Sequence, residues 1–158
     1  MKALIFRHPG TAMHGAWLAE EDVQSTGLQN EKRIVARCGQ MEWHAALLRY
    51  SDGGFYVHMG LPLLKKLQLT VGMEVDIELR VDDSIWQAPV PMEWQEVLWA
   101  DEEVRQAFEK LTMGRQRAVL FFLDRFKSVE KRQEWAVHIA AQLLEGHTDL
   151  QLLTQKNS

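Results

Sequence analysis

The stretch that decides the fold spans residues 51–79, SDGGFYVHMGLPLLKKLQLTVGMEVDIEL. It opens with Asp52-Gly53-Gly54, and glycines at such a turn supply the positive φ angles that tight hairpins require. Leucines follow at near-helical spacing over 61–69, and residues 74–81 then alternate charged and apolar side chains like a half-buried strand. Strand, short helix and strand in this order predict a small β-barrel in which the helix caps an open end.

The turn also predicts how its two flanking strands pair. If Tyr50 lies opposite Phe55, positions 46, 48 and 50 share one face with positions 55, 57 and 59. That face is apolar, so we expect it in the core. His44 and His58 then fall on opposite faces and cannot bind one metal ion together.

A change of pattern follows at residues 82–91, DDSIWQAPVP, where two prolines favour an extended linker. Beyond it, helical spacing predicts a short helix over 93–100 and another capped by Asp101. A third is predicted over 115–127, and a fourth follows Ser128 and ends at Gly146. We therefore predict an α+β protein: a β-barrel domain over 1–85, a helical unit of three to four helices over 90–147, and a frayed tail over 148–158.

Composition narrows the class of protein. The net charge is −4, which argues against a dedicated nucleic-acid binder, since such proteins rely on basic patches. The single cysteine, Cys38, excludes an internal disulfide framework. The first ten residues, MKALIFRHPG, lack the features of a signal peptide, and no window is apolar enough for membrane insertion. We expect a cytoplasmic bacterial protein.

No recognisable catalytic motif is present. The sequence lacks a nucleophile elbow, a phosphate-binding loop and a dinucleotide fingerprint, so it supports no catalytic residue, no cofactor and no named enzyme activity. The six histidines lack the spacing of a zinc site, and we predict no metal.

Basic residues gather where the last two predicted helices meet. Lys127 ends one helix and Lys131 begins the next, beside backbone amides that favour an anion. Arg132 adds a further charge, and Trp135 lies one turn beyond Lys131, where it can stack on a cation or a ring. The alternative is an ordinary solvated helix face, because acidic residues interleave with the basic ones: Asp124, Glu130 and Glu134.

Residues 90–146 resemble the bacteriocin-protection, YdeI/OmpD-associated family. The likeness rests on a Val-Pro start, an apolar helix, a Phe-x-x-Leu pair, a Lys-x-x-Glu-x-Arg stretch and a Leu-x-x-Gly end. The matching positions are Val90, Pro91, Leu98, Phe108, Leu111, Lys127, Glu130, Arg132, Leu143 and Gly146. Where the family pattern has a threonine and a second arginine, this chain has Lys131 and Trp135, so the resemblance carries over only Lys127 and Arg132 as anion-binding candidates.

The N-terminal part is similar to the small β-barrel domain of unknown function that often precedes this helical domain. The similarity lies in residues 53–56 (GGFY), 63–66 (LLKK) and 71–75 (VGMEV), with Met73 in place of an aspartate. Residues 70–81 are also similar to the half-barrels of AbrB-type regulators, which bind DNA as swapped dimers.

We therefore expect a binding protein whose partner is a protein or peptide, linked by the family's title to envelope or antimicrobial-peptide stress. The expected surface is the basic junction or an apolar patch or interdomain cleft lined by Trp86, Trp94, Trp99 or Trp135. Two alternatives remain open. A nucleic-acid-binding regulator would gather Arg49, Lys65, Lys66 and Arg80 on one face. An enzyme would give His44, His58 or Asp82 a matched partner in an interdomain polar pocket.

Overall fold

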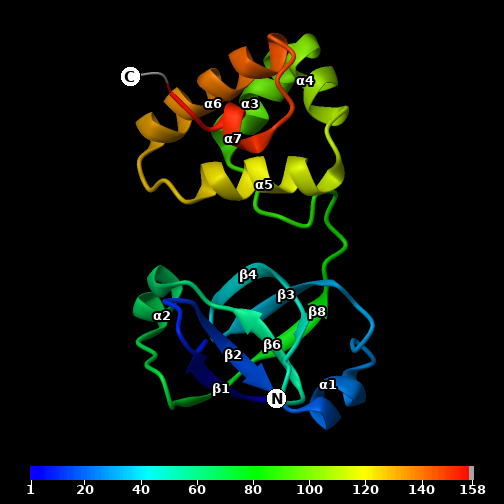
Figure 1. Cartoon of the computed structure of the whole chain (residues 1–158), viewed down its shortest axis with the longest axis vertical. Helices are drawn as coiled ribbons and strands as arrows, with labels where there is room; N and C mark the ends of the chain where they lie inside the picture. Colours follow the sequence, from blue (N-terminus) through cyan, green and yellow to red (C-terminus); the bar gives the residue numbers. More distant parts are fainter. Residues whose placement is uncertain (157–158) are drawn as a thin grey trace. The chain divides into compact units, whose positions relative to one another are not determined.

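The computed structural model describes residues 1–156 and consists of two compact units, one from Met1 to Asp83 and one that begins at Ser84. The first unit contains all eight strands and two short helices, and the second is helical (Figure 1). The predicted α+β class is confirmed. The strands and helices of the first unit are β1 (Lys2–Arg7), β2 (His14–Leu18), α1 (Glu20–Thr26), β3 (Arg33–Cys38), β4 (Met41–Ala46), β5 (Leu48–Arg49), β6 (Phe55–His58), α2 (Leu61–Leu67), β7 (Glu74–Asp76) and β8 (Glu78–Val81).

The strands form two antiparallel sheets, one of five strands in the order β5-β6-β2-β1-β7 and one of three in the order β4-β3-β8. The chain crosses from one sheet to the other at Leu47 and at Ile77, and both side chains are buried there. Their backbone amides are also paired, because Leu47 N–H donates to Lys32 O (3.1 Å) and Ile77 N–H donates to Met1 O (2.9 Å). The barrel is thus an open one made of two sheets, without a continuous ladder around it in residues 1–156.

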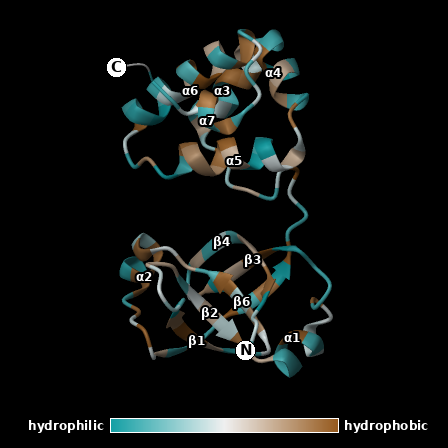
Figure 2. Ribbon diagram, viewed as in Figure 1, coloured by the Kyte–Doolittle hydropathy of each residue, from teal (hydrophilic) through white to brown (hydrophobic). Residues whose placement is uncertain are grey.

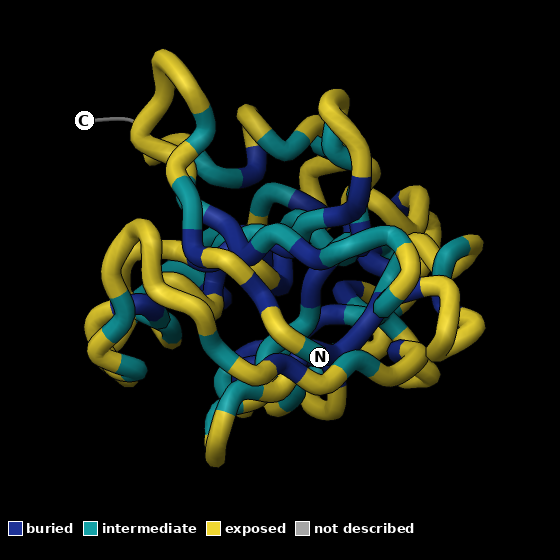
Figure 3. The backbone as a smooth tube through the Cα atoms, turned by 90° about the horizontal axis from the view of Figure 1, so that it is seen from below, coloured by how far each residue is buried: buried dark blue, intermediate teal, exposed yellow. Residues whose placement is uncertain are grey.

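Apolar side chains from both sheets form one core in this unit. Hydrophobic residues run along the strands, whereas α1 is mostly hydrophilic (Figure 2). Along the strands of this unit most residues are buried or half-buried, and Figure 3 shows how buried and exposed stretches alternate along the backbone. The largest side chains that are almost fully buried here are Ile5, Leu18, Ile34, Phe55, Met59 and Ile77.

The predicted pairing of the β5–β6 hairpin is wrong by one residue. Leu48 lies opposite Tyr56 and Arg49 opposite Phe55, while Tyr50 N–H donates to the Gly54 carbonyl (3.0 Å). Gly53 and Gly54 both have positive φ angles (105° and 80°), and three residues rather than four make the loop. Tyr50 therefore shares the outer face with Tyr56. Residues 43–50 do not form one strand, because β4 belongs to the three-stranded sheet and β5 to the five-stranded sheet. His44 and His58 therefore lie in different sheets, and the prediction that they occupy opposite faces of one hairpin does not apply.

The second unit contains α3 (Met92–Ala100), α4 (Glu102–Glu109), α5 (Met113–Asp124), α6 (Val129–Leu144) and α7 (Leu150–Leu153). The predicted caps at Asp101 and Ser128 are confirmed, since their side chains accept hydrogen bonds from Val104 N–H (3.2 Å) and Lys131 N–H (3.3 Å). The third helix begins two residues earlier than predicted, after the Thr112 cap. The core of the second unit surrounds Trp94, whose ring is fully buried against Phe108.

Two segments of the second unit differ from the prediction. Part of the expected linker folds into it: the Trp86 indole N–H donates to Gln116 Oε1 (2.7 Å), and Arg117 Nε donates to the Trp86 carbonyl (3.0 Å). The expected frayed tail contains a helical turn, α7, because Asp149 caps it and Leu153 is fully buried in the core. Residues 157–158 of that predicted tail lie outside the described residues.

The glycine pair of the hairpin provides a first test. A Cβ on Gly54 would lie 2.6 Å from the Leu18 carbonyl and 2.8 Å from Trp17 Nε1, whereas one on Gly53 meets nothing within 4 Å. Positive φ costs a non-glycine residue about 1–2 kcal/mol at either position, and overpacking adds about 1–3 kcal/mol at Gly54 alone. We expect Gly54→Ala to lower the unfolding free energy of the first unit more than Gly53→Ala does. Urea titration followed through amide signals of β2 and β6 measures both, and equal losses would contradict the steric argument.

Candidate binding site

The outer face of the five-stranded sheet is apolar and aromatic where solvated sheets usually carry polar side chains. Along β1, Ala3 and Ile5 point into the core and are almost fully buried, while Leu4 and Phe6 alternate with them on the outer side. The strand register aligns the outer residues in a row across all five strands of this sheet. Its members, from edge to edge, are Glu74, Leu4, Trp17, Tyr56 and Leu48, on β7, β1, β2, β6 and β5.

In the next row of the sheet a glycine, Gly15, leaves room for the Phe6 ring to approach those of Tyr50 and Tyr56. Gly15 lies between Phe6 and His58 in the register, and a Cβ there would be 2.8 Å from the Val57 carbonyl and 3.1 Å from Phe6 Cε1. The Phe6 ring occupies that space instead. Its centroid lies 5.3 Å from that of Tyr50 and 5.9 Å from that of Tyr56, both in edge-to-face geometry. This arrangement is the one that aromatic pairs favour.

Two histidines extend the same ring cluster. The centroid of His8 lies 4.8 Å from that of Phe6, 4.9 Å from that of Tyr56 and 5.5 Å from that of His58. His58 in turn lies 5.4 Å from Tyr56. Each of these five rings contacts at least two others, so the cluster restrains the orientations of its side chains. We call Leu4, Phe6, His8, Trp17, Tyr50, Tyr56 and His58 the aromatic face.

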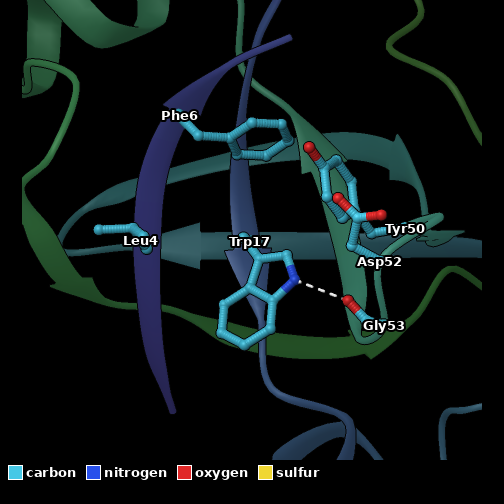
Figure 4. Close-up of a pocket in the computed structure, with 6 residues that line it drawn as sticks. All are labelled: Leu4, Phe6, Trp17, Tyr50, Asp52 and Gly53. Atoms are coloured by element: carbon cyan, nitrogen blue, oxygen red, sulfur yellow. Dashed lines mark hydrogen bonds between the residues drawn. The ribbon is translucent and has the colours of Figure 1, made fainter. Parts of the chain in front are cut away.

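Trp17 is fixed by the hairpin turn. Its indole N–H donates to the Gly53 carbonyl (2.9 Å), as Figure 4 shows, and the ring lies so close to Gly54 that no Cβ fits between them. The only hydrogen-bond donor of the indole is therefore engaged by the turn, and the Trp17 side chain is half-exposed.

An open pocket of about 360 Å³ lies beside Trp17 on this face. In Figure 4 the rings of Phe6 and Trp17 flank the opening, Leu4 lies on one side, and Tyr50 and Asp52 lie on the other. The walls are mainly apolar. The side chain of Asp52 is exposed and makes no ion pair or hydrogen bond within residues 1–156, and the same is true of the side chain of Glu74 at the end of the row. The site thus combines aromatic walls with two uncompensated carboxylates.

The residues predicted for an anion site in the second unit have different surroundings. Arg132 is only one-fifth exposed; its Nε lies 3.1 Å from Glu93 Oε2, and its Nη1 donates to the Phe126 carbonyl (2.6 Å). It thereby ties the start of α6 to α3 and to the loop after α5. The hydrogen bond from Arg132 holds the pKa of the Glu93 carboxyl below its usual value of 4.5. Arg132 is thus engaged inside the unit.

Trp135 is likewise packed. It stacks on Phe126 with centroids 5.9 Å apart and planes 15° apart, it meets Phe122 edge-on at 4.9 Å, and Lys156 Nζ lies 4.4 Å from its ring centroid. Lys127 and Lys131 are exposed, and Lys131 borders a shallow hollow that Glu130 and Glu134 also line. The cation over Trp135 comes from this chain's own tail. The four predicted residues divide into two packed and two solvated side chains.

The histidines and Asp82 were candidates for an enzyme site. His44 Nδ1 lies 2.6 Å from Asp82 Oδ2, and Asp82 is only 2% exposed. Such a contact orients an imidazole, and catalysis would also need a nucleophile or substrate site at the other ring nitrogen. The surrounding face of the three-stranded sheet carries cross-strand ion pairs, Arg80 with Glu42 (3.2 Å) and Arg37 with Glu78. Within residues 1–156 no three His, Cys, Asp or Glu side chains are grouped to bind a metal.

The tryptophans expected in an apolar patch also differ from one another. Trp86 and Trp94 belong to the core of the second unit, whereas Trp99 on α3 is 71% exposed. The sequence prediction named none of Leu4, Phe6 or Trp17. The signal that could have found them is the run Ala3-Leu4-Ile5-Phe6, which is apolar on both faces of an antiparallel strand.

The Glu93–Arg132 contact yields a stability prediction. Removing Arg132 leaves a nearly buried carboxylate and the Phe126 carbonyl without their donor, so Arg132→Ala should cost about 2–4 kcal/mol of unfolding free energy. Because the folded-state pKa of Glu93 is lowered, its contribution is complete above the unfolded-state pKa and disappears as the pH falls through the folded-state value. The gap between wild type and Glu93→Gln should therefore be largest near pH 7 and shrink toward pH 3.

Urea unfolding of the α6 amide signals at both pH values measures these differences. The exposed Lys131→Ala is the matched control and should change stability by less than about 0.5 kcal/mol. A loss for Lys131→Ala equal to that for Arg132→Ala would contradict the assignment.

Comparison with known proteins finds one family model that matches part of the second unit. Residues 87–146 match the family model described as bacteriocin-protection, YdeI or OmpD-associated. The match begins next to Trp86 and ends at Gly146, which has a φ of 92° just after α6, so it includes helices α3 to α6. No curated protein and no solved structure matches the chain. None of the helices described in residues 1–156 has the length and apolarity to cross a membrane. The predicted resemblance is confirmed: residues 87–146 of this chain match the model of the bacteriocin-protection, YdeI or OmpD-associated family.

Proposed function

We propose that this protein acts by binding a peptide, or an extended segment of a partner protein, on the aromatic face of its N-terminal unit. The observation that carries the proposal is the outward row of Leu4, Trp17 and Tyr56 with Phe6 and Tyr50 beside it. Aromatic side chains of this kind supply large contact areas and are enriched at protein interfaces.

The geometry suits an extended peptide. Side chains on one face of an extended chain repeat about every 7 Å, so a peptide crossing the sheet can place one side chain in the pocket and others against Tyr56 and His58. The rings are already held by their edge-to-face contacts. Binding therefore orders few protein side chains, which reduces its entropic cost.

Charge favours a peptide over nucleic acid at this face. Its free charges are the carboxylates of Asp52 and Glu74, which would repel phosphates. Two of the basic residues that a regulator would use are ion-paired, Arg49 with Glu20 (3.3 Å) and Arg80 with Glu42 (3.2 Å). The family title, bacteriocin-protection, YdeI or OmpD-associated, adds a context that fits a peptide partner. We place the protein in the cytoplasm, where its free Cys38 stays reduced.

A peptide library tests the proposal. Peptides selected from a random phage-displayed library on the full-length protein should lose about 10- to 100-fold in affinity for Trp17→Ala, because a central aromatic anchor contributes about 2 kcal/mol or more. Isothermal titration of the synthetic peptides measures the loss. We expect Trp99→Ala, which removes an exposed tryptophan from the other unit, to leave the affinity unchanged.

Two results would contradict the proposal. One is a library that yields no peptide with a measurable affinity. The other is a set of peptides that bind Trp17→Ala as tightly as wild type. Amide spectra of each variant show whether the first unit is still folded, so loss of structure is separated from loss of binding.

A further inference from the structure

We infer that the pocket beside Trp17 binds a cationic side chain, the guanidinium of arginine or the ammonium of lysine. The inference rests on the proposed function and adds the chemistry of the bound residue. It comes from three observations on the same face: ring surfaces at the pocket wall, an unpaired carboxylate at its rim, and neighbouring cations that are already engaged.

The ring surfaces come first. Phe6, Trp17 and Tyr50 line the pocket, and a cation over the face of such rings is attracted by their quadrupole, most strongly by tryptophan. Since the Trp17 N–H is taken by the Gly53 carbonyl, this indole presents no free donor to an anionic or carbonyl group. Leu4 completes a wall that suits the methylene stem of a long basic side chain.

The carboxylates of Asp52 and Glu74 favour a positive charge on the bound side chain. Asp52 lies at the pocket and has no partner within residues 1–156, and Glu74 lies next to Leu4 in the sheet register. The nearest basic neighbour in that register is Lys2, which is paired with Asp76 (3.2 Å). A neutral apolar side chain in the pocket would take water away from Asp52 without offering it a partner, and an anion would be repelled by it. A cation satisfies Asp52 and the rings together.

Small amides test this directly on the full chain. We would titrate ¹⁵N-labelled protein with Nα-acetyl-arginine amide and with Nα-acetyl-citrulline amide, which has nearly the same shape without the charge. The pair Nα-acetyl-lysine amide and Nα-acetyl-norleucine amide repeats the comparison. The Trp17 indole N–H signal, assigned by its absence in Trp17→Phe, reports on the pocket.

We expect the arginine and lysine amides to shift the Trp17 signal with millimolar affinity, at least about fivefold tighter than their neutral counterparts. Asp52→Asn should remove most of that preference. Asp83→Asn, which neutralises an exposed carboxylate outside the pocket, should retain it.

The inference is overturned if citrulline and norleucine amides bind as well as the charged amides, or if Asp52→Asn keeps the full preference. It is also overturned if no amide shifts the Trp17 signal. These results leave the proposed function standing as long as library-selected peptides still depend on Trp17. If the selected peptides bind Trp17→Ala as tightly as wild type, the proposed function itself is overturned, irrespective of the amide results.

Discussion

The close approach at Gly15 is the contact on which the outer face of the barrel depends. The Val57 carbonyl and the Phe6 ring both occupy space that any side chain at this position would need. Because β2 is the central strand of the five, a displacement there would disturb its pairing with β1 on one side and with β6 on the other. The glycine therefore serves two purposes: it lets three strands keep their spacing, and it lets one ring cross from β1 toward β5.

A second glycine contact sets where that surface ends. Gly54 leaves room for the Trp17 ring, and the carbonyl of the neighbouring Gly53 accepts the indole proton. The β5–β6 hairpin, whose turn has a clear sequence signal, therefore also shapes the pocket. Its three-residue loop turns Tyr50 outward and places Asp52 beside Trp17. With a loop of four residues, Tyr50 would face the core and the pocket would lose one wall.

The helical unit was predictable because its signals are local. Asp101 and Ser128 cap helices through bonds to residues only three positions away, and the apolar spacing within each helix marks the buried side. The aromatic face was not predictable in the same way. Its rings lie on β1, β2 and β6 or directly after β1 and β5, which are far apart in the sequence, and a one-residue difference in register exchanges the two faces of a strand. Arg132 shows the same limit, since its partner Glu93 lies on another helix.

The aromatic face has a composition that folding alone does not require. The core of the first unit is complete with the inward side chains, among them Ile5, Leu18 and Phe55, and all three are almost fully buried. Threonine or lysine at the outward positions would leave that core intact and would avoid an exposed apolar surface, which favours aggregation. Rings at these positions therefore expose apolar surface without adding to the core that stabilises the unit. A partner that covers them and offers a charge to Asp52 removes both the exposed surface and the unpaired carboxylate, and this is the physical reason to assign binding to this face.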